Sequence, residues 1–73
     1  MMMKKKITVA AVSVVGDIEM AKFGAVLEGD NYDISFYHQH LDKEACREHK
    51  DIRLADQAEF ESMVYDLQDQ LRK

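Results

Sequence analysis

Hydrophobic and polar residues alternate along the first forty positions, and the alternation predicts three strands. Segment 5–15 is rich in Ile, Val and Thr, segment 18–28 reads IEMAKFGAVLE, and segment 32–40 reads YDISFYHQH. A period of two is the spacing of side chains that share one face of a sheet. Gly16-Asp17 and Gly29-Asp30 separate the three segments, and such pairs are typical of tight hairpin turns. The pattern therefore predicts a three-stranded antiparallel meander.

The two turns also predict how the strands are paired. A two-residue loop at 16–17 places Val14 opposite Glu19, and a two-residue loop at 29–30 places Leu27 opposite Tyr32. In this register one face of the sheet is almost wholly apolar, so we expect it to be the core face. Its side chains are those of Ala10, Val12, Val14, Ala21, Phe23, Ala25, Leu27, Tyr32, Ile34 and Phe36.

The C-terminal segment carries the pattern of an amphipathic helix. Its apolar residues recur at helical spacing, at Phe60, Met63, Val64, Leu67 and Leu71. Asp56 followed by Glu59 resembles a capping box, which marks the start of a helix. We therefore expect a helix over about residues 57–72, lying across the core face of the sheet.

The connection 41–55 is less regular. Leu41, Ala45 and His49 are spaced as on one side of a short helix that Asp42 would cap, whereas residues 51–55 alternate like a brief edge strand. The pattern is compatible with either a short helix or an edge strand in this segment. The expected architecture is a single small α+β domain that spans residues 1–73.

The second face of the predicted sheet suggests where a partner binds. One helix covers one side of a small sheet, and large exposed apolar patches usually mark contact sites. We expect a homodimer, joined through this face or through the edge of the first strand, because a small domain gains needed burial by association. A different protein partner, or coverage of the face by segment 41–55, is the alternative. The expected face consists of Ile7, Val9, Val15, Ile18, Met20, Val26 and Tyr37.

Composition narrows the functional class. The 73 residues contain 10 Lys and Arg against 14 Asp and Glu, a net charge of −4. This charge disfavours direct binding of nucleic acid, whose affinity for proteins comes mostly from basic side chains. A single cysteine excludes an intramolecular disulfide and fits the cytoplasm. The apolar run from Ile7 to Val15 is shorter than the about 20 residues of a membrane span, and its alternation fits a strand better than a signal peptide.

Three histidines and the cysteine lie close together in the chain, at His38, His40, Cys46 and His49. Imidazole nitrogen and thiolate sulfur are the preferred ligands of zinc, and four of them close a structural site. The two strand histidines point to one face, and the other two residues share one turn of a helix. A small zinc-binding protein is therefore one alternative function. The spacing matches no common zinc motif, and a lone cysteine is more often a small buried apolar residue.

Acidic residues on the predicted helix offer a further alternative. Glu61, Asp66 and Asp69 would form an exposed face that could inhibit a nucleic-acid-binding protein by occupying its basic surface. No catalytic pattern or phosphate-binding loop is present. We therefore expect a non-enzymatic protein-interaction module without a cofactor. Its small size, its acidity and the lack of a chemical signature are typical of accessory proteins of bacteria and bacteriophages.

Overall fold

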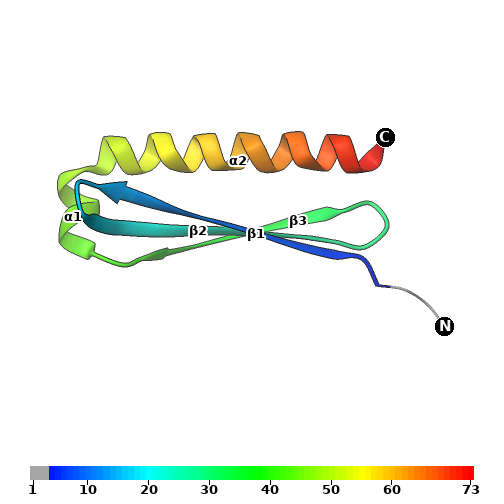
Figure 1. The fold of residues 1–73 in the computed structure, drawn as a ribbon, viewed down its shortest axis with the longest axis horizontal. Coiled ribbons are helices and arrows are strands. Elements are labelled where there is room, and N and C mark those ends of the chain that lie inside the picture. Colours follow the sequence, from blue (N-terminus) through cyan, green and yellow to red (C-terminus); the bar gives the residue numbers. More distant parts are fainter. Residues whose placement is uncertain (1–3) are drawn as a thin grey trace.

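The computed structural model describes residues 4–73 and shows an α+β fold in two layers (Figure 1). The strands form an antiparallel sheet in the order β1-β2-β3, and the long helix α2 lies across one face of it. This confirms the predicted meander and the C-terminal helix packed on one side of it. The elements in chain order are β1 (Lys6–Val15), β2 (Ile18–Glu28), β3 (Asp33–His40), α1 (Lys43–Glu48) and α2 (Lys50–Arg72).

The two helices differ in how well the sequence predicts them. The short helix α1 starts as expected, because the Asp42 carboxylate accepts a hydrogen bond of 3.0 Å from the Ala45 amide. Helix α2 begins at Lys50 rather than near residue 57, so residues 51–55 are helical and form no edge strand. Asp56 lies inside α2 and is no N-cap. Its carboxylate accepts a hydrogen bond from the Ser13 hydroxyl of β1 instead.

One irregularity in the pairing of β1 with β2 decides which side of β1 is buried. Val14 lies opposite Glu19, as the two-residue turn predicts, but Ser13 lies opposite Ala21. Met20 of β2 therefore has no partner residue on β1 in the described ladder. Such a β-bulge shifts the register by one residue, and a shift of one moves every side chain to the other face. Ala11 rather than Ala10 is consequently opposite Phe23.

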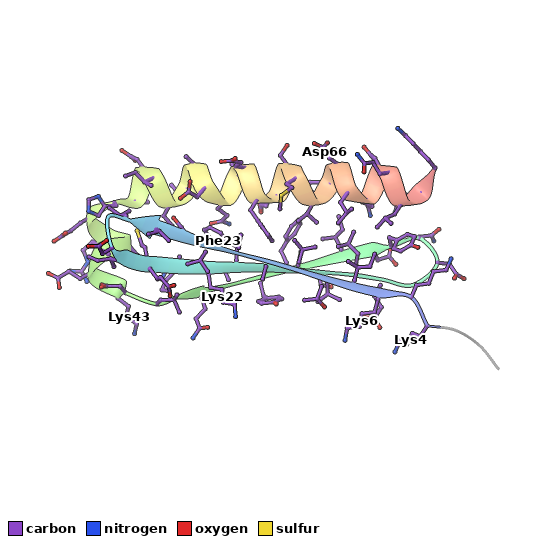
Figure 2. The ribbon with its side chains drawn as sticks, in the orientation of Figure 1. Lys4, Lys6, Lys22, Phe23, Lys43 and Asp66 are labelled. Atoms are coloured by element: carbon purple, nitrogen blue, oxygen red, sulfur yellow. The ribbon has the colours of Figure 1, made fainter. Side chains whose placement is uncertain are left out.

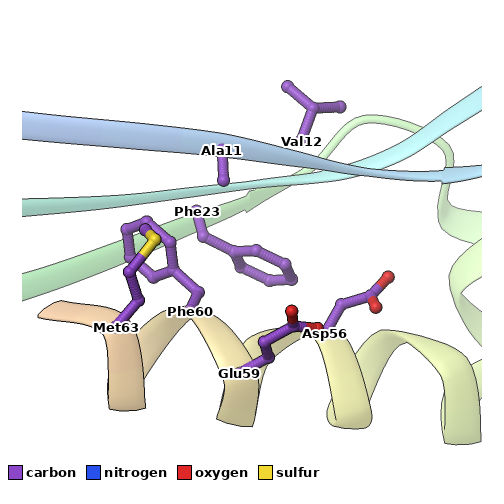
Figure 3. A pocket seen from close by; sticks show the side chains of 7 residues that line it. All are labelled: Ala11, Val12, Phe23, Asp56, Glu59, Phe60 and Met63. Atoms are coloured by element: carbon purple, nitrogen blue, oxygen red, sulfur yellow. The ribbon is translucent and has the colours of Figure 1, made fainter.

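The core face predicted for β1 is therefore wrong. The three residues expected inside are exposed: Ala10, Val12 and Val14. The residues that pack against the core are the alternate set, Ile7, Val9, Ala11 and Val15. Figure 3 shows the consequence directly, because the Ala11 side chain points toward α2 and that of Val12 points away from it.

The bulge also anchors α1. The Met20 side chain is fully buried, and its carbonyl oxygen accepts hydrogen bonds from the amides of Leu41 and Asp42 at 3.0 and 3.1 Å. The Cys46 thiol of α1 donates to the same oxygen at 3.2 Å. An unpaired strand residue thus provides the attachment point for the connection between sheet and helices.

The second hairpin departs from its predicted register without changing faces. Leu27 lies opposite Ile34 and Ala25 opposite Phe36, so each β2 residue pairs two positions later on β3 than a two-residue loop requires. A shift of two residues keeps every side chain on its face. The core face predicted for β2 and β3 is for this reason correct even though the pairing is not.

The core is small and lies in one layer between α2 and the sheet. Phe60 of α2 packs beside Phe23 and Phe36, with ring centroids 6.0 and 6.5 Å away. A core built largely of small side chains gives a chain of this length little stability of its own. In the described chain the buried apolar residues are Met20, Ala21, Phe23, Ala25, Leu27, Ala45, Cys46, Phe60 and Val64.

The sheet face that points away from α2 is of mixed polarity. Tyr37 lies across Gly24 in its middle, so closely that a Cβ at Gly24 would come within 2.1 Å of the ring. Exposed Thr8, Ser35 and Gln39 flank this pair. Lys4, Lys6, Lys22 and Lys43 project on this side, whereas Asp66 lies on the far side of α2 (Figure 2). Of the residues expected on this face, the bulge turns Ile7, Val9 and Val15 of β1 inward.

Two valines of β1 test the register. We expect Val9→Asp to destabilise the fold by about 3 kcal/mol or more, because it places a carboxylate against the core. We expect Val14→Asp to cost less than about 1 kcal/mol, because the side chain already faces solvent. Urea unfolding followed by circular dichroism measures both. A larger loss of stability for Val14→Asp than for Val9→Asp would contradict the bulge and support the register predicted without it.

The contact between Gly24 and Tyr37 gives a second test. We expect Gly24→Ala to destabilise the protein by about 1 kcal/mol, because the added methyl group displaces the Tyr37 ring. In a Tyr37→Ala background the same change should be neutral or stabilising, because alanine is the better strand residue once the space is free. Thermal unfolding of the four proteins measures this coupling. Equal effects of Gly24→Ala in both backgrounds would contradict it.

Candidate interaction surface

The histidine and cysteine residues are only partly brought together. His38 and His40 are neighbours on the helix-covered side of β3, with ring centroids 5.7 Å apart. Cys46 is buried, and its sulfur faces the Met20 carbonyl. His49 lies at the junction of α1 and α2. Of the four candidate ligands, the structure thus places two side by side.

His40 is in contact with a cation. The Arg53 guanidinium of α2 donates a hydrogen bond of 3.3 Å from Nη1 to His40 Nε2, because arginine has donors only. This arrangement occupies the lone pair that a zinc ion would use, so binding of zinc at this nitrogen requires Arg53 to move. Within residues 4–73 no three His, Cys, Asp or Glu side chains are grouped to hold a metal ion.

The outer edge of β1 has the character of a binding surface. β1 ends the sheet, and its outer side has no neighbouring strand in the described chain. From Ile7 to Val15 it contains neither a charged residue nor proline. Exposed edges are normally protected by such residues, because unpaired amide and carbonyl groups are a template for another strand. The opposite edge, β3, is shorter and carries Asp33, His38 and His40.

One hydrogen bond identifies the free backbone groups of β1. The Gly29 amide donates to the Lys5 carbonyl at 3.0 Å, so the backbone groups of Lys5 point toward β2. In an antiparallel ladder this direction alternates from residue to residue. The N–H and C=O groups of Thr8, Ala10 and Val12 consequently point outward, away from β2.

A groove runs beside this edge on the helix side (Figure 3). It has a volume of about 250 Å³, and its lining includes Ala11, Phe23, Phe60 and Met63. Met63 is 49% exposed, although the helical pattern assigned it to the core stripe. We name the outward backbone of Thr8, Ala10 and Val12, together with the Met63 side chain, the β1 edge surface.

The residues expected to form the interaction face are divided by the structure. Tyr37 and Val26 lie on the open sheet face, and Ile18 is exposed beside the first turn. The remaining four, Ile7, Val9, Val15 and Met20, are in or against the core. Thr8, Ala10, Val12 and Met63 were not among the expected residues, although the edge of the first strand was one of the two expected contact regions.

The acidic helix face is present as a surface. Asp66 and Asp69 are exposed on α2, and Glu61 is half-buried. Nothing in the described contacts identifies a basic partner for them, so inhibition of a nucleic-acid-binding protein stays a hypothesis.

Comparison of the chain with protein-family models, curated proteins and solved structures finds no match. None of the helices in residues 4–73 combines the length and apolar content that crossing a membrane requires. The function has to be inferred from the geometry of this chain.

Zinc titration tests the histidine cluster. We expect Cys46→Ser to leave zinc affinity unchanged, because the thiol is buried and bonded to the Met20 carbonyl. His40→Ala should weaken any binding that occurs, because His38 and His40 are the adjacent pair. Isothermal calorimetry with the purified variants measures both. Loss of zinc on Cys46→Ser would show that the four residues assemble by rearrangement.

Proposed function

We propose that the protein is a non-enzymatic interaction module that binds another polypeptide strand at the β1 edge surface. The observation that supports this is the ten-residue end strand, uncharged from Ile7 to Val15 and uncovered in the described chain. Proteins that recognise partners by strand addition use backbone hydrogen bonds for affinity and neighbouring pockets for specificity. The β1 edge surface offers both outward-pointing backbone groups and a neighbouring groove.

The energetics favour a covered edge. Each backbone hydrogen bond contributes about 1 kcal/mol net, so an added strand that pairs with Thr8, Ala10 and Val12 gains several kcal/mol. The groove beside Met63 can accept an apolar side chain of the added strand. An uncovered edge of this length and composition would instead promote aggregation.

The other candidate surfaces have less support. The open sheet face is mixed in polarity, and its central Tyr37 already packs on Gly24. Zinc binding has two adjacent histidines, one of them in contact with Arg53. The proposal keeps the cytoplasm as the location, because the single cysteine is a free thiol.

A strand peptide tests the proposal without knowledge of the natural partner. The peptide KKITVAAVSVV repeats residues 5–15. We expect its addition to slow amide exchange at Thr8, Ala10 and Val12 and to leave Phe36 and His38, whose amides point outward at the β3 edge, unchanged, as measured by NMR. The control peptide carries proline in place of Ala10, because proline removes an amide donor from the new ladder.

A matched pair of protein variants completes this test. Ala10→Pro should abolish peptide binding and retain the fold, because the lost amide points outward. Ala11→Pro should unfold the protein, because that amide points toward β2. Absence of protection at peptide concentrations of about 1 mM, which correspond to about 4 kcal/mol of binding free energy, would contradict the proposal.

A further inference from the structure

We infer that the polypeptide that covers the β1 edge surface is a second copy of this chain, paired antiparallel about a two-fold axis that passes beside Ala10. The inference rests on the proposed function and adds the identity and geometry of the partner. Strand β1 is suited to pair with itself, because Ile7 to Val15 offers no charge that would meet a like charge.

The antiparallel direction follows from the layers. A two-fold axis perpendicular to the sheet makes the two β1 strands antiparallel and keeps both α2 helices on one side. The two sheets then form one continuous six-stranded sheet. A parallel pair would need an axis along the strands, and this would put the two helices on opposite faces. Only the antiparallel arrangement brings the groove of one copy beside the groove of the other.

The register follows from the direction of the backbone groups. Residues that point outward can bond only to residues of the second copy that also point outward. With the axis at Ala10, Thr8 lies opposite the second copy's Val12, and Lys6 lies opposite the second copy's Val14. Every outward-pointing residue from Lys6 to Val14 then has a partner. An axis at Val9 or Ala11 leaves an outward-pointing residue at one end of β1 unpaired.

This register also separates the charges at the strand ends. The five pairs of outward residues make about ten hydrogen bonds between the copies, as many as a typical protein interface has. The two Lys6 side chains are eight positions apart along the paired strands, or about 27 Å. That distance exceeds the about 8 Å over which charges interact at physiological salt.

The helices place Met63 at the same axis. The hydrogen bond between Ser13 and Asp56 aligns β1 with α2, and Arg72 bonds to the Asn31 carbonyl at the other end of the sheet. Ala10 lies three residues from Ser13, about 10 Å along the strand. The same length of α2 covers about seven residues and leads from Asp56 to Met63.

Two exposed methionines therefore meet across the axis, above the joined β1 edges. Met63 is unbranched and polarisable, which suits it to filling an irregular groove such as the one beside it. The same symmetry places Glu59 opposite the second copy's Leu67 and one position from the second copy's Asp66. Association would bury side chains that the single copy leaves exposed, Val12 at 44% and Met63 at 49%.

Native mass spectrometry and light scattering of the purified protein test the partner. We expect a dimer for the unmodified chain, and a dissociation constant at least about 100-fold higher for Ala10→Pro and for Met63→Glu. Ser35→Glu is the control, because it adds a charge on the open face of β3 and should leave the dimer intact. Circular dichroism verifies that each variant is folded.

Cysteine cross-linking tests the register in a Cys46→Ser background. Ala10→Cys places two thiols on opposing residues about 5.5 Å apart between Cα atoms, within reach of a disulfide. Thr8→Cys and Val12→Cys place the two thiols four positions apart along the strands, about 13 Å. We expect rapid dimer formation on oxidation for Ala10→Cys and much slower formation for the other two.

The possible outcomes distinguish failure of the second copy as the partner from failure of the β1 edge surface as the binding site. A monomer that still binds the strand peptide would overturn the second copy as partner and leave the edge as the binding surface. A dimer that Ser35→Glu disrupts and Ala10→Pro does not would move the interface to the open face and overturn both. Faster cross-linking of Thr8→Cys or Val12→Cys would overturn the axis at Ala10.

Discussion

The hydrogen bonds at the Met20 carbonyl are the interaction on which the other parts of the structure depend. Three donors from the connection and α1 meet at this one oxygen: the amides of Leu41 and Asp42 and the Cys46 thiol. Met20 is free to accept them because the β1–β2 ladder passes over it. The same omission turns Ile7, Val9 and Ala11 toward α2. One extra strand residue thereby fixes the inner side of β1 and the position at which the chain leaves the sheet.

The elements were largely predictable from the sequence because their signals are local. Alternation and turn residues define the three strands, and Asp42 caps α1 as a short polar side chain does at a helix start. The start of α2 was missed because Asp56 has the chemistry of a cap. Its carboxylate is bonded instead to Ser13, forty-three positions away. A contact between residues so far apart in the sequence produces no periodic pattern. Because Asp56 is not the cap, the helix extends back to Lys50.

The faces were less predictable than the strands. The turn at Gly16-Asp17 correctly pairs Val14 with Glu19, and the error enters one residue later at the bulge. Both sides of β1 are rich in apolar residues, so the pattern alone could not reveal which side was buried. The outward direction of the β1 amides does not depend on this phase, because the extra residue lies in β2. It follows from the bond between Gly29 and Lys5.

The distribution of charge across the open face bears on why β1 carries no charge from Ile7 to Val15. In one row of the sheet, Val12 of β1 lies beside Lys22 of β2, which lies beside Gln39 of β3. All three side chains are exposed, so a lysine at Val12 would cost the core nothing. Protection of a free edge requires charge on the outer strand, and here the lysine is on the inner one. This order is the reverse of what a solvent-exposed edge needs. It is the order expected when the outer strand is itself an inner strand of a larger sheet, with another β1 beside it.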